Sequence, residues 1–154
     1  MYLAPQEVRT FFVTSVTSDR RAIFQSERMS NLLLHVMRDY RSQRKFLLHE
    51  FVIMPDHFHL LLTPAANVPL EKAVQYIKGG FSFRAKRELD FKASIWERSF
   101  TNYRVGGADH YARLRGYIRR NPVKRFLAGS EDCFPYSSAY PGAAIDPEPP
   151  WLKP

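Results

Sequence analysis

Two hydrophobic segments that meet at a short Met-Pro-Asp corner dominate the middle of the sequence. Residues 46–54 and 57–63 have the length and apolar character of β-strands, so we expect an antiparallel pair. Because side chains alternate faces along a strand, His57 and His59 should point to one face and Phe58 to the other. The two imidazoles, roughly 7 Å apart along the strand, could converge on one divalent cation. Two histidines on the solvent-exposed face of a sheet, with no metal, would give the same sequence pattern.

The charge balance indicates the kind of partner. The chain has 154 residues, with 23 Lys and Arg against 15 Asp and Glu, which gives a net charge of +8. This bias favours a polyanion, with nucleic acid first and an anionic membrane surface second. No apolar run approaches the ~20 residues needed to span a bilayer, and the N-terminus lacks a secretory signal. The single Cys133 fits a reducing compartment, so we expect a cytoplasmic protein.

Strand-like and helix-like segments alternate in an order that predicts the fold. The expected elements are a strand at 10–17, a helix after Ser26, strands at 46–54 and 57–63, a helix from Pro69, a strand at 94–100 and a last helix from Ala108. The order β-α-β-β-α-β favours an α+β fold, a ferredoxin-like antiparallel sheet with two helices on one face. The C-terminal helix carries a tyrosine, and the opposite face of the sheet is left free for a site. Residues 1–140 should form one domain.

Three places should interrupt regular structure. Gly79-Gly80 lies within the second helix and predicts a break, a kink or a close backbone approach. Asn121-Pro122 should end or bend the last helix, because the residue before proline is pushed out of the α region. Residues 141–154 hold five of the eleven prolines, so we expect an extended C-terminal tail outside the core.

The Asp-His-Phe-His string at 56–59 is open to three interpretations. A histidine-triad hydrolase needs a third alternating histidine as nucleophile, but Leu61 occupies that position. A zinc hydrolase needs further close histidine or cysteine ligands, and the remaining histidines are scattered along the chain. In the third interpretation the two histidines bind a cation together with one more polar ligand. A nucleophile from elsewhere in the chain then attacks a phosphate-bearing substrate.

The last helix could supply those parts. Tyr117 and Asn121 are four residues apart and can share one face of a helix, so the phenol could stand near a cation that Asn121 helps to hold. Both residues could equally have purely structural roles. Tyr117 could be the amphipathic edge of a packed stripe, and Asn121 before Pro122 could be a helix cap.

Four blocks of sequence resemble the REP-associated tyrosine transposases, which belong with the single-tyrosine HUH transposases. The match lies in the order and spacing of the blocks, which spread over most of residues 10–140. They are Val52–Leu62 with its His-Phe-His, Ile95–Phe100, Tyr117–Val123 and Phe134–Ser138.

The resemblance implies a mechanism and a set of site residues. His57 and His59 would bind a divalent cation, Mg²⁺ or Mn²⁺, with Asn121 as a third ligand. Tyr117 would be the catalytic nucleophile, cleaving single-stranded DNA near palindromic hairpin repeats through a covalent 5′-phosphotyrosine intermediate. The protein would act as a monomer or a homodimer.

Basic residues on the two later helices are expected to track DNA phosphates, and exposed aromatic side chains to stack on bases. The phosphate-binding candidates are Arg113, Arg119, Arg120, Lys124, Lys78 and Arg84, and the stacking candidates are Tyr103, Phe83 and Trp96. For Trp96, packing in the core is the preferred interpretation. Two alternatives remain: a hairpin-binding protein that does not cut DNA, and a phosphohydrolase that uses water as nucleophile.

Overall fold

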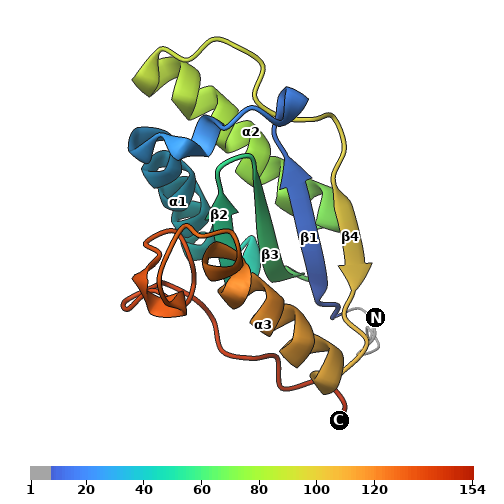
Figure 1. Ribbon diagram of the computed structural model, residues 1–154. Coiled ribbons are helices and arrows are strands. Elements are labelled where there is room, and N and C mark those ends of the chain that lie inside the picture. Colours follow the sequence, from blue (N-terminus) through green and yellow to red (C-terminus); the bar gives the residue numbers. More distant parts are fainter. Residues whose placement is uncertain (1–7) are drawn as a thin grey trace.

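A four-stranded antiparallel sheet forms the centre of the molecule in the computed structural model, which describes residues 8–154 (Figure 1). The strand order is β2-β3-β1-β4. In chain order the strands and helices are β1 (Phe11–Val16), α1 (Glu27–Ser42), β2 (Phe46–Met54), β3 (His57–Pro64), α2 (Leu70–Leu89), β4 (Thr101–Arg104) and α3 (Ala108–Lys124), with 3₁₀ turns at Ser18–Arg20, Ile23–Gln25 and Glu131–Cys133. This order and sheet confirm the predicted ferredoxin-like fold.

One face of the sheet packs on α1 and α2 (Figure 1). Alternate residues of the central strands, such as Val13, Phe58 and Leu60, are fully buried against these helices. Helix α1 begins where the sequence predicts, because the Ser26 hydroxyl accepts a hydrogen bond from the N–H of Met29 (3.4 Å). This layer holds most of the hydrophobic core.

The opposite face, which we expected to be free, is partly covered by α3 (Figure 1). A smaller apolar cluster joins strand residues such as Phe12 and Leu61 to Tyr111 and Ile118 of α3. The helix therefore lies over the same side of β3 that carries the two histidines, since residues 57, 59 and 61 share a face.

The fourth strand lies later in the chain than predicted. It is Thr101–Arg104, which pairs with β1, whereas the segment 94–100 makes only an isolated bridge between Trp96 and Thr17. Every side chain of β4 is exposed, so this edge strand has no apolar alternation to reveal it. Trp96 instead packs its ring against Phe24 and neighbouring aromatic residues in the core.

Neither predicted helix interruption occurs as a break. Helix α2 runs through Gly79-Gly80, and a Cβ added at Gly80 would lie 2.8 Å from the Tyr40 ring. Gly80 thus permits a close approach of α1 and α2, which was one of the expected alternatives. Helix α3 also continues past Pro122 to Lys124, because the proline lies within its last turn and gives up only one N–H donor there.

The proline-rich tail has no helix or strand, but it is not separate from the core. Arg41 of α1 binds the Asp146 carboxylate through two hydrogen bonds of 2.9 and 3.0 Å. The carbonyl of Pro147 lies 2.8 Å from Nδ1 of His49, and Ile145 packs against the main core. The expectation of a tail outside the core was wrong, since prolines prevent regular structure without preventing burial. Among the described residues no helix has the length and apolar character to span a membrane.

Candidate active site

The two histidines lie side by side on the α3 face of β3, with their ring centroids 4.7 Å apart. Each has a partner on its Nδ1 atom. Asp56 Oδ1 lies 2.6 Å from Nδ1 of His57, and Thr14 Oγ1 of the neighbouring strand lies 2.8 Å from Nδ1 of His59. Partners of this kind fix the ring orientation and leave Nε2 to bind a ligand, as around many metal-binding histidines.

The Nε2 atom of His59 is buried and has no hydrogen-bond partner. Leaving such an atom unpaired costs roughly 1–3 kcal/mol, and a bound group would remove that cost. A neutral imidazole nitrogen without a partner is free to bind a metal. Among residues 8–154 no three His, Cys, Asp or Glu side chains gather around a common point, so further ligands would be of other types. The histidine pair therefore fits a cation whose remaining ligands are an amide, a substrate oxygen or water.

The surroundings keep both imidazoles neutral. Burial lowers the pKa of His57, although the Asp56 carboxylate acts in the opposite direction. Burial lowers the pKa of His59 to about 3, with smaller contributions from His57 and from the positive charge of Arg125. Neutral histidine is the form that binds metal, so the site does not depend on deprotonation near neutral pH.

Tyr117 stands beside His59. Its ring centroid lies 5.3 Å from that of His59 and 6.1 Å from that of Phe12, both in edge-on geometry. Tyr117 is 44% exposed, so a substrate can reach it while its inner edge packs. Asn121 lies one turn further along α3 and is buried. The structure thus brings Tyr117 and the histidines together, and the role of Asn121 as a ligand stays a prediction.

A partly buried ion pair holds α3 in this position. The Glu50 carboxylate of β2 accepts hydrogen bonds of 2.9 and 3.0 Å from Arg119 of α3. The same carboxylate accepts a 2.6 Å hydrogen bond from the Ser138 hydroxyl. Arg119 lies two residues from Tyr117, so this pairing sets the rotation of α3 and with it the direction of the phenol.

The predicted DNA-binding residues fall into two groups. Arg113, Arg120 and Lys124 are exposed on α3. The other three have internal partners: Arg119 binds Glu50, Lys78 donates to the carbonyl of Glu97 (3.0 Å), and Arg84 binds Asp39 and Glu88. Lys78 and Arg84 belong to α2, on the face of the sheet away from the histidines. A DNA contact by any of the six stays a prediction.

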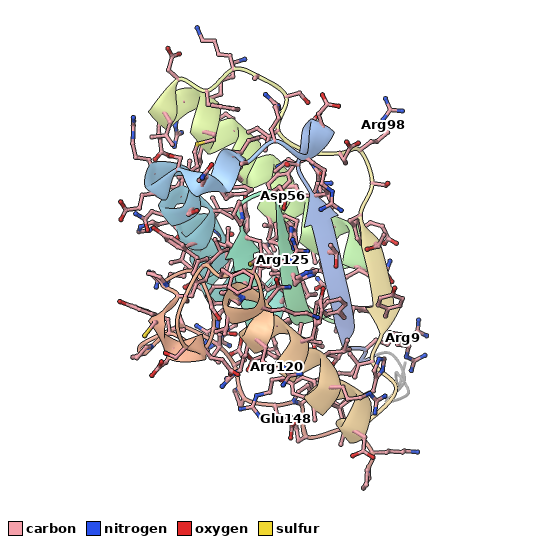
Figure 2. The ribbon with its side chains drawn as sticks, viewed as in Figure 1. Arg9, Asp56, Arg98, Arg120, Arg125 and Glu148 are labelled. Atoms are coloured by element: carbon pink, nitrogen blue, oxygen red, sulfur yellow. The ribbon has the colours of Figure 1, made fainter. Side chains whose placement is uncertain are left out.

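Sequence reasoning missed several residues that shape the site. Thr14 and Glu50 are the clearest, because nothing in their local sequence shows that β3 and α3 will contact them. Arg125 was not among the DNA-binding candidates, yet its charge lowers the pKa of both histidines. Figure 2 shows Arg125 at the C-terminal end of α3, and Asp56, whose carboxylate contacts His57, follows β2 at the corner before β3. Arg20 pairs with that carboxylate at 3.5 Å.

Comparisons with known proteins identify the family. The model of the IS200-like transposases matches residues 9–121, a range that includes the histidines, Tyr117 and Asn121. The chain belongs to this transposase family. Membership implies an enzyme that cleaves DNA and takes part in transposition.

Solved structures agree on the fold of this family member. A REP-associated tyrosine transposase bound to a REP hairpin matches with a TM-score of 0.71 and 22% identity, covering 95% of this chain and 91% of that one. A putative transposase from Deinococcus radiodurans R1 matches with a TM-score of 0.55 and 22% identity, covering 76% and 91%. A comparison with curated proteins gave no match.

Proposed function

We propose that this IS200-like transposase is a metal-dependent endonuclease and strand transferase for single-stranded DNA. In this proposal Tyr117 forms a covalent 5′-phosphotyrosine bond during cleavage. The observation that carries it is the position of the Tyr117 ring, 5.3 Å from that of His59, whose buried Nε2 has no partner. This places a candidate nucleophile beside a nitrogen that can bind a cation, and a cation near the nucleophile assists phosphoryl transfer.

His57 and His59 would hold the cation through Nε2, with the side-chain oxygen of Asn121 as a third ligand. Their Nδ1 contacts with Asp56 and Thr14 support this role, because they fix the ring orientation. Imidazole suits transition metals and an amide oxygen suits harder ions, so Mg²⁺ and Mn²⁺ are both candidates. When bound, the cation polarises the scissile phosphate and offsets negative charge in the transition state.

The reaction exchanges one phosphodiester bond for another. The Tyr117 phenol loses its proton and attacks phosphorus, the bond to the 3′ oxygen breaks, and that oxygen leaves as a 3′-OH. The protein then carries a 5′-phosphotyrosine. Because the energy of the phosphodiester is retained, another 3′-OH can rejoin the strand without ATP. A free phenol has a pKa near 10, so nearby positive charge or a base must assist the loss of its proton.

The substrate would lie along α3. The REP-associated relative was solved with a REP hairpin, and we extend that ligand type to this chain as a proposal. Exposed Arg113, Arg120 and Lys124 would then contact phosphates. Lys78 and Arg84 would contribute less, because their charges already have partners on the far side of the sheet.

A denaturing gel tests the proposal. Purified protein is incubated with a hairpin oligonucleotide that has a labelled single-stranded flank, with Mg²⁺ or Mn²⁺ or with EDTA. We expect a covalent protein–DNA band that requires the cation and is absent in Tyr117→Phe. Binding without such a band would favour a protein that holds hairpins but does not cut. Cleavage that survives Tyr117→Phe would instead indicate water as the nucleophile.

A further inference from the structure

An aromatic side chain occupies an unusual position at the C-terminal end of α3. The N–H of Phe126 donates to the carbonyl of Val123 (3.1 Å), and the N–H of Leu127 donates to the carbonyl of Pro122 (2.8 Å). This pair of hydrogen bonds is the Schellman motif, in which the residue at the Phe126 position has left-handed backbone angles and is usually glycine. Phe126 has φ of +61°. Its Cβ makes that conformation unfavourable.

Packing does not compensate for this strain. Phe126 is 94% exposed, more than any other large hydrophobic side chain of the described residues. The backbone angles of Phe126 therefore lower stability, and its exposed ring gains no burial that would offset this cost. Backbone outliers of this kind are found preferentially at ligand sites and switches.

The neighbourhood of the ring is basic and close to the candidate active site. Arg125, which precedes Phe126, is exposed and directly follows α3, the helix that carries Tyr117 and Asn121. Figure 2 shows Arg120 and Arg125 following one another towards this end of α3. A planar apolar ring next to exposed guanidinium groups matches the two parts of a nucleotide, its base and its phosphate.

We infer that Arg125 and Phe126 form a clamp for one unpaired nucleotide of the DNA strand, beside the scissile phosphate. The guanidinium binds a backbone phosphate, and the phenyl ring stacks on the adjoining base. The inference rests on the proposed function, since it takes single-stranded DNA as the ligand. Arginine can bind phosphate through two parallel hydrogen bonds, and stacking on an aromatic ring tolerates any base. The clamp therefore holds the strand without reading its sequence.

The variant Phe126→Gly separates this role from a structural one, because its effects on stability and on binding should have opposite signs. Glycine relieves the backbone strain, so we expect Tm to rise by about 2–4 °C. Loss of the stacked base should weaken DNA binding by roughly 5- to 100-fold. Binding is measured by fluorescence anisotropy with a labelled hairpin oligonucleotide that has a single-stranded flank, at one fixed salt concentration.

Two further variants serve as matched controls. Asp90 ends α2 with φ of +53°, on the opposite face of the sheet. Asp90→Gly makes the same backbone change far from the site and should leave DNA affinity unchanged. Phe126→Trp keeps an aromatic ring and should retain affinity. A 2-aminopurine base placed at successive positions of the flank should be quenched at one position by the wild type, and not by Phe126→Gly.

The outcomes distinguish this inference from the proposed function. Unchanged affinity in Phe126→Gly, or no quenched position in the wild type, overturns the clamp even if the covalent Tyr117 band forms. A loss of affinity and of quenching supports the clamp even if no covalent band forms, and in that case the proposed cleavage chemistry fails instead. Unchanged affinity together with loss of self-association in Phe126→Gly would show that the ring contacts a second protein copy, which also overturns the clamp.

Discussion

On the α1 and α2 face of the sheet the central strands present Val13, Phe58 and Leu60, all fully buried and apolar. On the α3 face the same strands present Thr14, His57 and His59, with hydrogen bonds to the two imidazoles. The first face buries a large apolar layer, whereas the second buries polar groups beneath a helix held by the Glu50–Arg119 ion pair. Most of the apolar burial that stabilises the fold therefore lies on the α1 and α2 face, and the residues of the candidate active site lie on the α3 face.

This separation explains how the site can keep an unpaired buried nitrogen. The large apolar layer provides stability that offsets a cost of roughly 1–3 kcal/mol at Nε2 of His59. Substitutions on the α1 and α2 face should then lower stability while sparing chemistry, and substitutions on the α3 face should do the reverse. Three variants test that contrast, in decreasing order of expected effect, and a change of pH tests a fourth and smaller effect on stability.

Phe58→Ala should give the largest change. The ring is fully buried and packs against Trp96, so its removal should cost about 3–5 kcal/mol of unfolding free energy. Because Phe58 points away from its histidine neighbours, the fraction of folded protein that forms the covalent DNA band should stay the same. Urea unfolding gives the first quantity and the denaturing gel the second. If Phe58→Ala were fully folded and still failed to form the covalent band, the separation of stability and chemistry between the two faces would be contradicted.

His59→Ala should have the opposite profile. Removing a direct ligand should weaken Mn²⁺ binding at least as much as loss of a supporting partner does, by about 100-fold or more. The stability cost should be smaller than that of Phe58→Ala, since the unpaired buried nitrogen leaves with the side chain. Mn²⁺ should raise the Tm of the wild type and not of the variant. An equal rise in both proteins would exclude His59 as a ligand.

Thr14→Val, a substitution on the same face of the sheet as His59, should weaken metal binding by less than His59→Ala does. The change keeps the shape of the side chain but removes the oxygen that lies 2.8 Å from Nδ1 of His59. Partners of this kind typically contribute about 10–100-fold in metal affinity or activity. A Mn²⁺ titration compares the variant with Ser15→Ala, whose hydroxyl on the other face of β1 is buried without a partner. Only Thr14→Val should weaken metal binding.

Lowering the pH should reduce the stability of the protein through His49, and this should be the smallest of the four effects. Burial lowers the pKa of this residue, although the nearby charges of Asp146 and Glu50 raise it. The unfolded chain therefore binds a proton more readily, and stability should fall as the pH drops below about 6.5. The pKa values of His57 and His59 shift the same way, so His49→Gln should reduce the pH dependence of urea unfolding without abolishing it.

The sequence was informative where side-chain pattern and chain order determine structure. The alternation around Phe58 predicted which residues face the core, and the β-α-β-β-α-β order predicted the sheet. It was uninformative where partners lie far apart in the chain. Nothing near Arg119 shows that it binds Glu50, 69 residues away, so it was grouped with the phosphate-binding candidates. Trp96 fills the core from a segment without regular structure, which made that segment resemble a strand.

The same limit applies to the site. The two histidines and Tyr117 could be named from their spacing and from the family resemblance, and the structure brings them together. Thr14 could not be found, because its relevance comes from the pairing of β1 with β3, in which it stands opposite His59. Phe126 could not be found either, since only the backbone angle and exposure of this residue mark it as unusual.

The alternation along β3 has a consequence for misfolding. A slip of β3 by one residue against its neighbours would turn both imidazoles into the apolar layer and expel Phe58. Such a chain would lose the histidine pair from the α3 face and its hydrophobic anchor in the same event. A misaligned sheet would therefore lack both the stability of the native fold and its candidate active site, so no one-residue slip preserves one without the other.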